Sequence, residues 1–150
     1  MKVCFIGGGN MATALIGGLL KQNFVAAQVS VVEVNVSQHI KLYDEFGVQA
    51  VAELEAGVAG SDVIVLAVKP QQLHGVAISL APLLTGQLLI SIAAGIRAVD
   101  LARWLGSQNI VRAMPNTPAL IRSGISGVYA LPAVSKGQCD TAQTILAAVG

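Results

Sequence analysis

Residues 2–20, KVCFIGGGNMATALIGGLL, place a short apolar run, three glycines and a helical pattern directly after one another. The apolar run at 2–6 is bounded by glycine, as in a parallel strand that is covered on both faces. After the glycines, apolar residues recur at three- and four-residue spacing, and Asn10 can cap the helix that this pattern predicts. The stretch therefore predicts a strand, a glycine turn and a helix, around which the rest of the chain is organised.

The remaining sequence repeats this alternation. Apolar and β-branched runs predict strands at 29–34, 48–51, 63–68, 87–92, 110–114 and 126–131, and helical patterns lie at 37–46, 54–59, 70–84, 99–105 and 135–149. Ser37 is the predicted cap of the second helix and Gly47 its end, while Pro70 suits a first helical turn and keeps Lys69 out of helical geometry. Regular alternation with right-handed crossovers predicts a Rossmann-like, doubly wound α/β fold, a mainly parallel sheet with helices on both faces. No linker or repeat interrupts it, so one domain is expected over 1–150.

Composition narrows the function classes. The chain has 150 residues, of which 54% are hydrophobic and 11% charged, with a net charge of +1, so it can fill a core but offers no basic face for nucleic acid. Two stretches without charge, 3–20 and 70–96, are interrupted by glycine, proline and glutamine, which argues against a membrane span and favours a cytoplasmic protein. Cys4 and Cys139 are isolated from each other and from histidines at ligand spacing, so no metal or redox site is predicted, and Cys4 is expected to be buried in a strand.

The glycine turn carries a binding motif. Gly7, Gly9 and Ala12 form GxGxxA, in which the first glycine permits a tight turn, the second lets the backbone approach a pyrophosphate, and the alanine lets helix and strand pack closely. Amides at the helix N-terminus then hold the anion. Glu33 follows Ala12 by 21 residues, at the end of the second predicted strand, where an acid can hold the ribose hydroxyls. The motif in this context predicts a dinucleotide site, and the absence of a following GKS or GKT excludes a phosphate loop.

Four segments together resemble one family. IGGGNMATALIGGLL at 6–20, LAVKPQQ at 66–72, SIAAGI at 91–96 and RAMPNTPA at 112–119 are similar, in the same order, to pyrroline-5-carboxylate reductase. The resemblance implies reduction of 1-pyrroline-5-carboxylate to L-proline, the last step of proline biosynthesis, by hydride from NADPH or NADH, in a homodimer or higher homo-oligomer. It also implies a helical C-terminal domain beyond residue 150 that supplies the dimer interface and closes the substrate pocket. An isolated 1–150 chain is therefore expected to bind cofactor without turnover, and no catalytic residue is assigned within it.

The resemblance also implies the cofactor contacts of this chain. The residues expected to hold the pyrophosphate are those of the turn 7–12, among them Gly7, Gly9, Asn10, Met11 and Ala12. Those expected to line the far side of the cofactor are Ala67, Val68, Lys69 and Pro70. Those expected to lie at the nicotinamide end are Ala93, Ala94, Gly95, Met114, Pro115, Asn116 and Thr117. After the second strand, the Glu33 carboxylate repels a 2′-phosphate and favours NADH, whereas Asn35 would admit NADPH if Glu33 turned away. The choice between the two cofactors stays open at this stage.

A cyclic imine loses positive charge when it accepts hydride, so an acid such as histidine is not required, and the motifs contain hydroxyls, amides and Lys69 but no histidine. His74 is expected on a helix surface or seam, Arg112 in a structural role, and Trp104 and Leu105 in the core. Lys69 is either a cofactor contact or an exposed loop residue. Two other functions fit the fold: a β-hydroxyacid-dehydrogenase-like reductase, and a non-catalytic NAD(P)-binding regulatory module.

Overall fold

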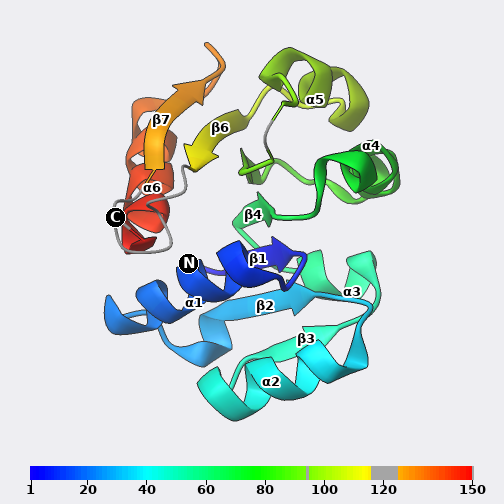
Figure 1. The fold of residues 1–150 in the computed structure, drawn as a ribbon. Helices are drawn as coiled ribbons and strands as arrows, with labels where there is room; N and C mark the ends of the chain where they lie inside the picture. Colours follow the sequence, from blue (N-terminus) through cyan, green and yellow to red (C-terminus); the bar gives the residue numbers. More distant parts are fainter. Residues whose placement is uncertain (94, 116–124, 150) are drawn as a thin grey trace.

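The strands form a single sheet that carries the whole domain. The structure, a computed structural model, describes residues 1–93, 95–115 and 125–149. Seven strands lie in the order β3-β2-β1-β4-β5-β6-β7 (Figure 1). They are β1 Val3–Ile6, β2 Val29–Val32, β3 Gln49–Val51, β4 Val63–Leu66, β5 Leu88–Ser91, β6 Ile110–Pro115 and β7 Ile125–Ala130. β1 to β6 are parallel, and β7 pairs antiparallel with β6 at the edge of the sheet.

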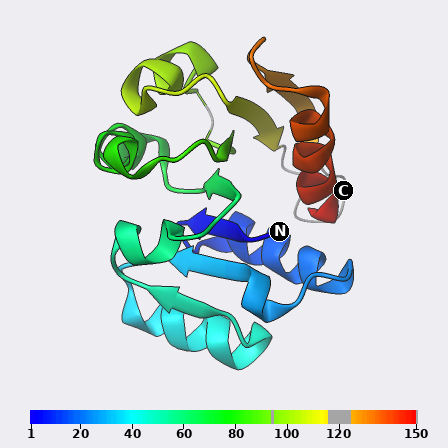
Figure 2. The same cartoon turned by 180° about the vertical axis from the view of Figure 1, so that it is seen from behind.

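Helices cover both faces of the sheet, as Figures 1 and 2 show from opposite sides. They are α1 Asn10–Lys21, α2 Val36–Phe46, α3 Leu54–Val58, α4 Pro70–Leu80, α5 Ala98–Leu105 and α6 Lys136–Leu146, with 3-10 turns η1 Ala26–Gln28, η2 Ala81–Leu83 and η4 Ala147–Val149. One core layer joins the sheet to α1, α2 and α6 through residues such as Leu15, Leu42 and Ile145. The other joins it to α3, α4 and α5 through residues such as Leu73 and Leu101. The Rossmann-like, doubly wound prediction is confirmed.

The strand order fixes the place of a ligand site. Successive strands step outward from β1 to β2 and β3, and the chain then returns to place β4 on the other side of β1. The direction of winding therefore reverses between β1 and β4. In sheets of this kind, ligands bind outside the carboxyl ends of the strands at the point of reversal.

Several predicted boundaries need correction, each for a local reason. The N-cap of α1 is Gly9 and not the predicted Asn10, because Gly9 still has an extended backbone and Asn10 is already helical. Asn35 rather than Ser37 caps α2, and its Oδ1 accepts from the Ser37 N–H at 3.0 Å. The predicted helix 70–84 ends at residue 80, and a 3-10 turn follows, because Pro82 cannot continue an α-helix.

Other predictions about single residues are confirmed. Gly47 ends α2 with a φ of 71°, and Lys69 has an extended backbone directly before α4. Cys4 is fully buried in β1. His74 lies on the exposed side of α4, with its ring edge-on to Trp104 at a centroid distance of 4.7 Å. It therefore occupies the seam between α4 and α5.

The prediction of Trp104 as a core residue needs correction, and the predicted structural role of Arg112 can be compared with its surroundings. Trp104 is only half-buried, because it sits in the α4–α5 seam, whereas Leu105 belongs to the core as expected. Arg112 is half-buried on β6, and its Nε is buried without a hydrogen-bond partner in the described part of the chain.

Among the described residues, none of the helices combines the length and the apolar character that crossing a bilayer requires.

Candidate dinucleotide site

The carboxyl ends of β1, β2 and β4 are held in register by backbone hydrogen bonds that continue past the strands. The Gly7 N–H donates to the Val32 carbonyl at 2.8 Å, and the Ala67 N–H donates to the Ile6 carbonyl at 2.9 Å. The Glu33 N–H donates to the Val51 carbonyl at 2.8 Å. The glycine turn, the residues after β2 and the residues after β4 therefore meet at the point where the winding of the sheet reverses.

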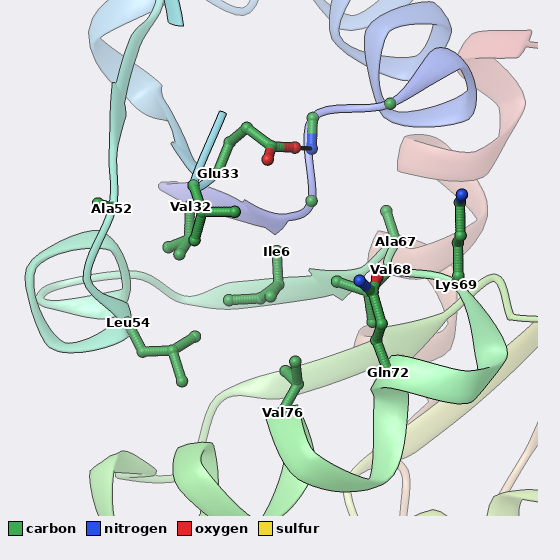
Figure 3. Close-up of a pocket in the computed structure, with 14 residues that line it drawn as sticks. Ile6, Val32, Glu33, Ala52, Leu54, Ala67, Val68, Lys69, Gln72 and Val76 are labelled. Atoms are coloured by element: carbon green, nitrogen blue, oxygen red, sulfur yellow. Dashed lines mark hydrogen bonds between the residues drawn. The ribbon is translucent and has the colours of Figure 1, made fainter. Parts of the chain in front are cut away.

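A cleft of about 340 Å³ opens at this point (Figure 3). Six predicted cofactor residues line it: Gly7, Gly9, Glu33, Ala67, Val68 and Lys69. Gly8, which lies within the predicted pyrophosphate turn 7–12, lines it as well. Seven residues that were not predicted complete the lining: Ile6, Val32, Val34, Ala52, Leu54, Gln72 and Val76. The structure thus brings together the ends of three strands that are 25 residues or more apart in the sequence.

Gly7 and Gly9 are required for different reasons. Gly7 has a φ of +100°, and a Cβ there would lie 2.9 Å from the Ala67 carbonyl oxygen, so the fold itself demands glycine. Gly9 has a φ of −77°, which any residue adopts, and a Cβ there would meet no atom of the described residues within 4 Å. These residues leave the space beside Gly9 open. This is the expected environment of a backbone segment that a ligand approaches closely.

The start of α1 supplies donors to that open space. The first N–H groups of any helix have no partner within it, and no side chain of the described residues caps α1. Their partial positive charge and free N–H groups suit an anion such as a pyrophosphate. The absence of a capping side chain is therefore consistent with a ligand taking that role.

Glu33 is fixed by two backbone donors. Its Oε1 accepts from the Gly8 N–H at 2.9 Å, which Figure 3 shows as a dashed line, and its Oε2 accepts from the Asn35 N–H at 3.0 Å. Two residues of α2 brace this arrangement: the Gln38 amide donates to the Gly8 carbonyl, and the His39 Nε2 contacts the Glu33 carbonyl. The carboxylate is therefore held against the glycine turn rather than being free in solvent.

Most of the remaining wall of the cleft is apolar, apart from Lys69 and Gln72. Ile6, Leu54 and Val76 extend toward the same space from β1, α3 and α4 (Figure 3). A flat aromatic base can bury its faces against such side chains, while the anionic and hydroxylated parts of a nucleotide meet the glycine turn and Glu33. The donors, the carboxylate and the apolar wall together fit the adenosine and pyrophosphate portion of a dinucleotide.

The other predicted cofactor residues lie elsewhere. Asn10 lines a separate hollow with Thr13 and Gln38, Met11 and Ala12 pack toward the core, Asn35 caps α2, and Pro70 is the first residue of α4. Ala93 is buried after β5, Gly95 is exposed with a φ of +79°, and Met114 and Pro115 end β6. Ala94, Asn116 and Thr117 lie outside the described residues. The nicotinamide half of the site therefore stays a prediction.

The missed residues carried a partial signal. Lys69, Gln72 and Val76 are spaced as one stripe of a helix, and only Lys69 was assigned to the site. Ala52 directly follows β3, a fourth strand whose carboxyl end borders the cleft, and Leu54 begins α3 two residues later. Apolar residues at such positions look the same in the sequence whether they fill a core or line a cleft.

The described ranges contain no group of three His, Cys, Asp or Glu side chains that could hold a metal ion.

Comparisons with known proteins agree with this geometry. Residues 2–95 match the family described as "NADP oxidoreductase coenzyme F420-dependent". A pyrroline-5-carboxylate reductase of Pseudomonas aeruginosa is 48% identical over 99% of this chain and 55% of its own length. The corresponding enzyme of Escherichia coli is 38% identical over 85% of this chain and 48% of its own length. The chain thus spans about half the length of the curated relatives that it matches.

Solved structures give the same relationship. A pyrroline-5-carboxylate reductase of Coxiella burnetii, 37% identical, superimposes with a TM-score of 0.94 over 99% of this chain and 56% of that one. The Plasmodium falciparum enzyme, described with NADP bound, is 27% identical, with a TM-score of 0.83 over 100% of this chain and 55% of that one. A prephenate dehydrogenase of Aquifex aeolicus, 16% identical with a TM-score of 0.76, shares the fold.

Proposed function

Because this chain belongs to the family described as NADP oxidoreductases, coenzyme F420-dependent, we propose that it is the dinucleotide-binding part of a pyrroline-5-carboxylate reductase. The observation that carries the proposal is the cleft at the reversal of the sheet, which combines the glycine turn, Glu33 and an apolar wall. The similarity to pyrroline-5-carboxylate reductases over 99% of the chain supports this enzyme rather than another reductase of the same fold.

The reaction is reduction of 1-pyrroline-5-carboxylate to L-proline, and a bound NADH or NADPH supplies the hydride. The residues of this chain bind and orient the cofactor. The free N–H groups at the start of α1 hold the pyrophosphate, which the bare backbone of Gly9 allows to approach closely. Glu33 holds the ribose, and the apolar wall shields the adenine from water. Lys69 lines the cleft, and its ammonium group balances part of the negative charge of the phosphates.

The substrate pocket and the subunit interface belong, in this proposal, to a helical C-terminal domain that residues 1–150 do not contain. Holding the imine against the nicotinamide converts a bimolecular reaction into one between fixed partners, and this step requires the second domain. The longer protein is accordingly proposed to act as a homodimer or higher homo-oligomer in the cytoplasm.

Two measurements on the purified 1–150 chain test the proposal. Titration with NADH and with NADPH, followed by the fluorescence of the reduced nicotinamide, is expected to show saturable binding. The same chain is expected to give no oxidation of either cofactor when 1-pyrroline-5-carboxylate is added. Failure of both cofactors to bind would contradict the assigned site. Turnover by residues 1–150 alone would contradict the assignment of the substrate pocket to a second domain.

A further inference from the structure

We infer that Glu33 makes this chain select NADH over NADPH, although its family is described by NADP and one solved relative is described with NADP bound. The inference rests on the proposed function, because it concerns the ribose end of the same cleft. It follows from what surrounds the position where the 2′-substituent of the adenosine ribose is expected.

The first argument is the fixed orientation of the carboxylate. A free glutamate can swing away from a phosphate, but both oxygens of Glu33 already accept from backbone N–H groups, of Gly8 and of Asn35. Rotation away from the site would leave these two donors without their acceptor. The negative charge therefore stays at the end of β2, where it can accept from ribose hydroxyls and repels a 2′-phosphate.

The second argument is that the start of α2 is already capped. Enzymes can hold a phosphate with the free N–H groups of a helix N-terminus. Here the Ser37 N–H donates to the Asn35 side chain, and the N–H groups of Gln38 and His39 donate to the Asn35 carbonyl. The Ser37 hydroxyl also donates to the Asn35 side chain, at 2.6 Å. The groups that could have bound a 2′-phosphate are largely engaged.

The third argument is the placement of cations. Residues 33–40, EVNVSQHI, contain no lysine or arginine. Lys41 comes next, but it lines the separate hollow together with Asp44 and Glu45. Lys69 lines the cleft from the start of α4, on the opposite side from Glu33 (Figure 3). Within the part of the chain that the structure describes, a 2′-phosphate, which carries a charge of about −1.5 to −2 at neutral pH, would thus meet a carboxylate without a neighbouring guanidinium or ammonium group.

The test compares NADH and NADPH on the same protein, since the two differ only in the 2′-phosphate. The wild-type chain is expected to bind NADH about tenfold more tightly than NADPH, or better, as judged by nicotinamide fluorescence. Glu33→Gln removes the charge, keeps the side-chain length and one acceptor, and is expected to bring the two dissociation constants within about threefold of each other. Glu45→Gln, an equal change of charge on the exposed side of α2, is the matched control and should keep the wild-type preference.

Equal or tighter binding of NADPH by the wild-type chain would overturn the inference, and this comparison needs no variant. Retention of a tenfold NADH preference in a folded Glu33→Gln protein would overturn it as well, because the selectivity would then come from another group. If neither cofactor bound the wild-type chain, the proposed dinucleotide site itself would fail.

Discussion

Replacement of Gly9 by alanine is expected to weaken the binding of the dinucleotide strongly and to change the stability of the fold only slightly. The backbone at Gly9 has ordinary angles, and a Cβ there has no neighbour within 4 Å among the described residues, so no clash with these residues is expected. Gly9 is the N-cap of α1, a position where glycine is preferred over alanine, so the free energy of unfolding should fall, by no more than about 1 kcal/mol. Thermal or urea unfolding measures this.

The same methyl group occupies the open space that we assign to the pyrophosphate. Pushing the phosphates away from the turn weakens one or two charge-assisted hydrogen bonds, each worth about 1.5–3 kcal/mol. The dissociation constant for NADH should therefore rise about 10- to 100-fold. Fluorescence titration of the folded variant measures the effect.

Gly75→Ala is the matched control. Gly75 lies in α4, a Cβ there also meets no atom within 4 Å in the described parts of the chain, and the residue does not line the cleft. This variant should be more stable than wild type by about 0.5–1 kcal/mol, because alanine favours a helix interior, and should bind NADH as wild type does. A Gly9→Ala protein that bound NADH like Gly75→Ala would refute the placement of the pyrophosphate.

Three further changes test the packing of the domain. Gly57→Ala should lower the free energy of unfolding by about 1–3 kcal/mol, because the new Cβ would lie 2.1 Å from Cγ2 of Val32, whose side chain is stiff. Urea denaturation measures this, and unchanged stability would show that α3 is free to shift. Gly18→Ala should destabilise by a similar amount, about 1–3 kcal/mol, because its Cβ would lie 2.2 Å from the Ala148 carbonyl oxygen, and wild-type melting would contradict the close packing of η4 on α1. Burial raises the pKa of the Cys4 thiol from 9.0 to about 11, so folding disfavours the thiolate. The contribution of the buried thiol to the free energy of unfolding is therefore complete below pH 9 and is lost as the pH rises toward 11. Above pH 9 the wild type should lose up to about 1.4 kcal/mol per pH unit relative to Cys4→Val, and parallel pH profiles of the two proteins would contradict this.

The fold could be predicted because each strand and each turn carried a local signal. Runs such as VIVL at 63–66 have few alternatives to a buried parallel strand, and the glycines and prolines between the runs mark their ends. The antiparallel direction of β7 could not be predicted in this way. It depends on the path between β6 and β7, which alternation alone does not specify.

The candidate site was predictable where backbone geometry dictates residue type. Gly7 and Glu33 stood out because a tight turn and an acid at a strand end are rarely interchangeable with other residues. Val76 and Leu54 did not stand out, since an apolar residue in a helix gives no sign of which neighbour it will face. The prediction of Ser37 as the cap of α2 was wrong because Asn35 and Ser37 are both good capping residues. Only the backbone geometry, which the sequence does not show, decides between them.

The two backbone bonds of Glu33 also bear on how readily this protein can be redesigned. A cofactor switch made by deleting Glu33 would leave the Gly8 and Asn35 N–H groups in need of a new acceptor, so the change that admits NADPH also loosens the contact between the glycine turn and α2. The phosphate of NADPH could itself become that acceptor. A laboratory selection for NADPH use should then favour variants that melt at lower temperature without the cofactor and regain their stability when it is added.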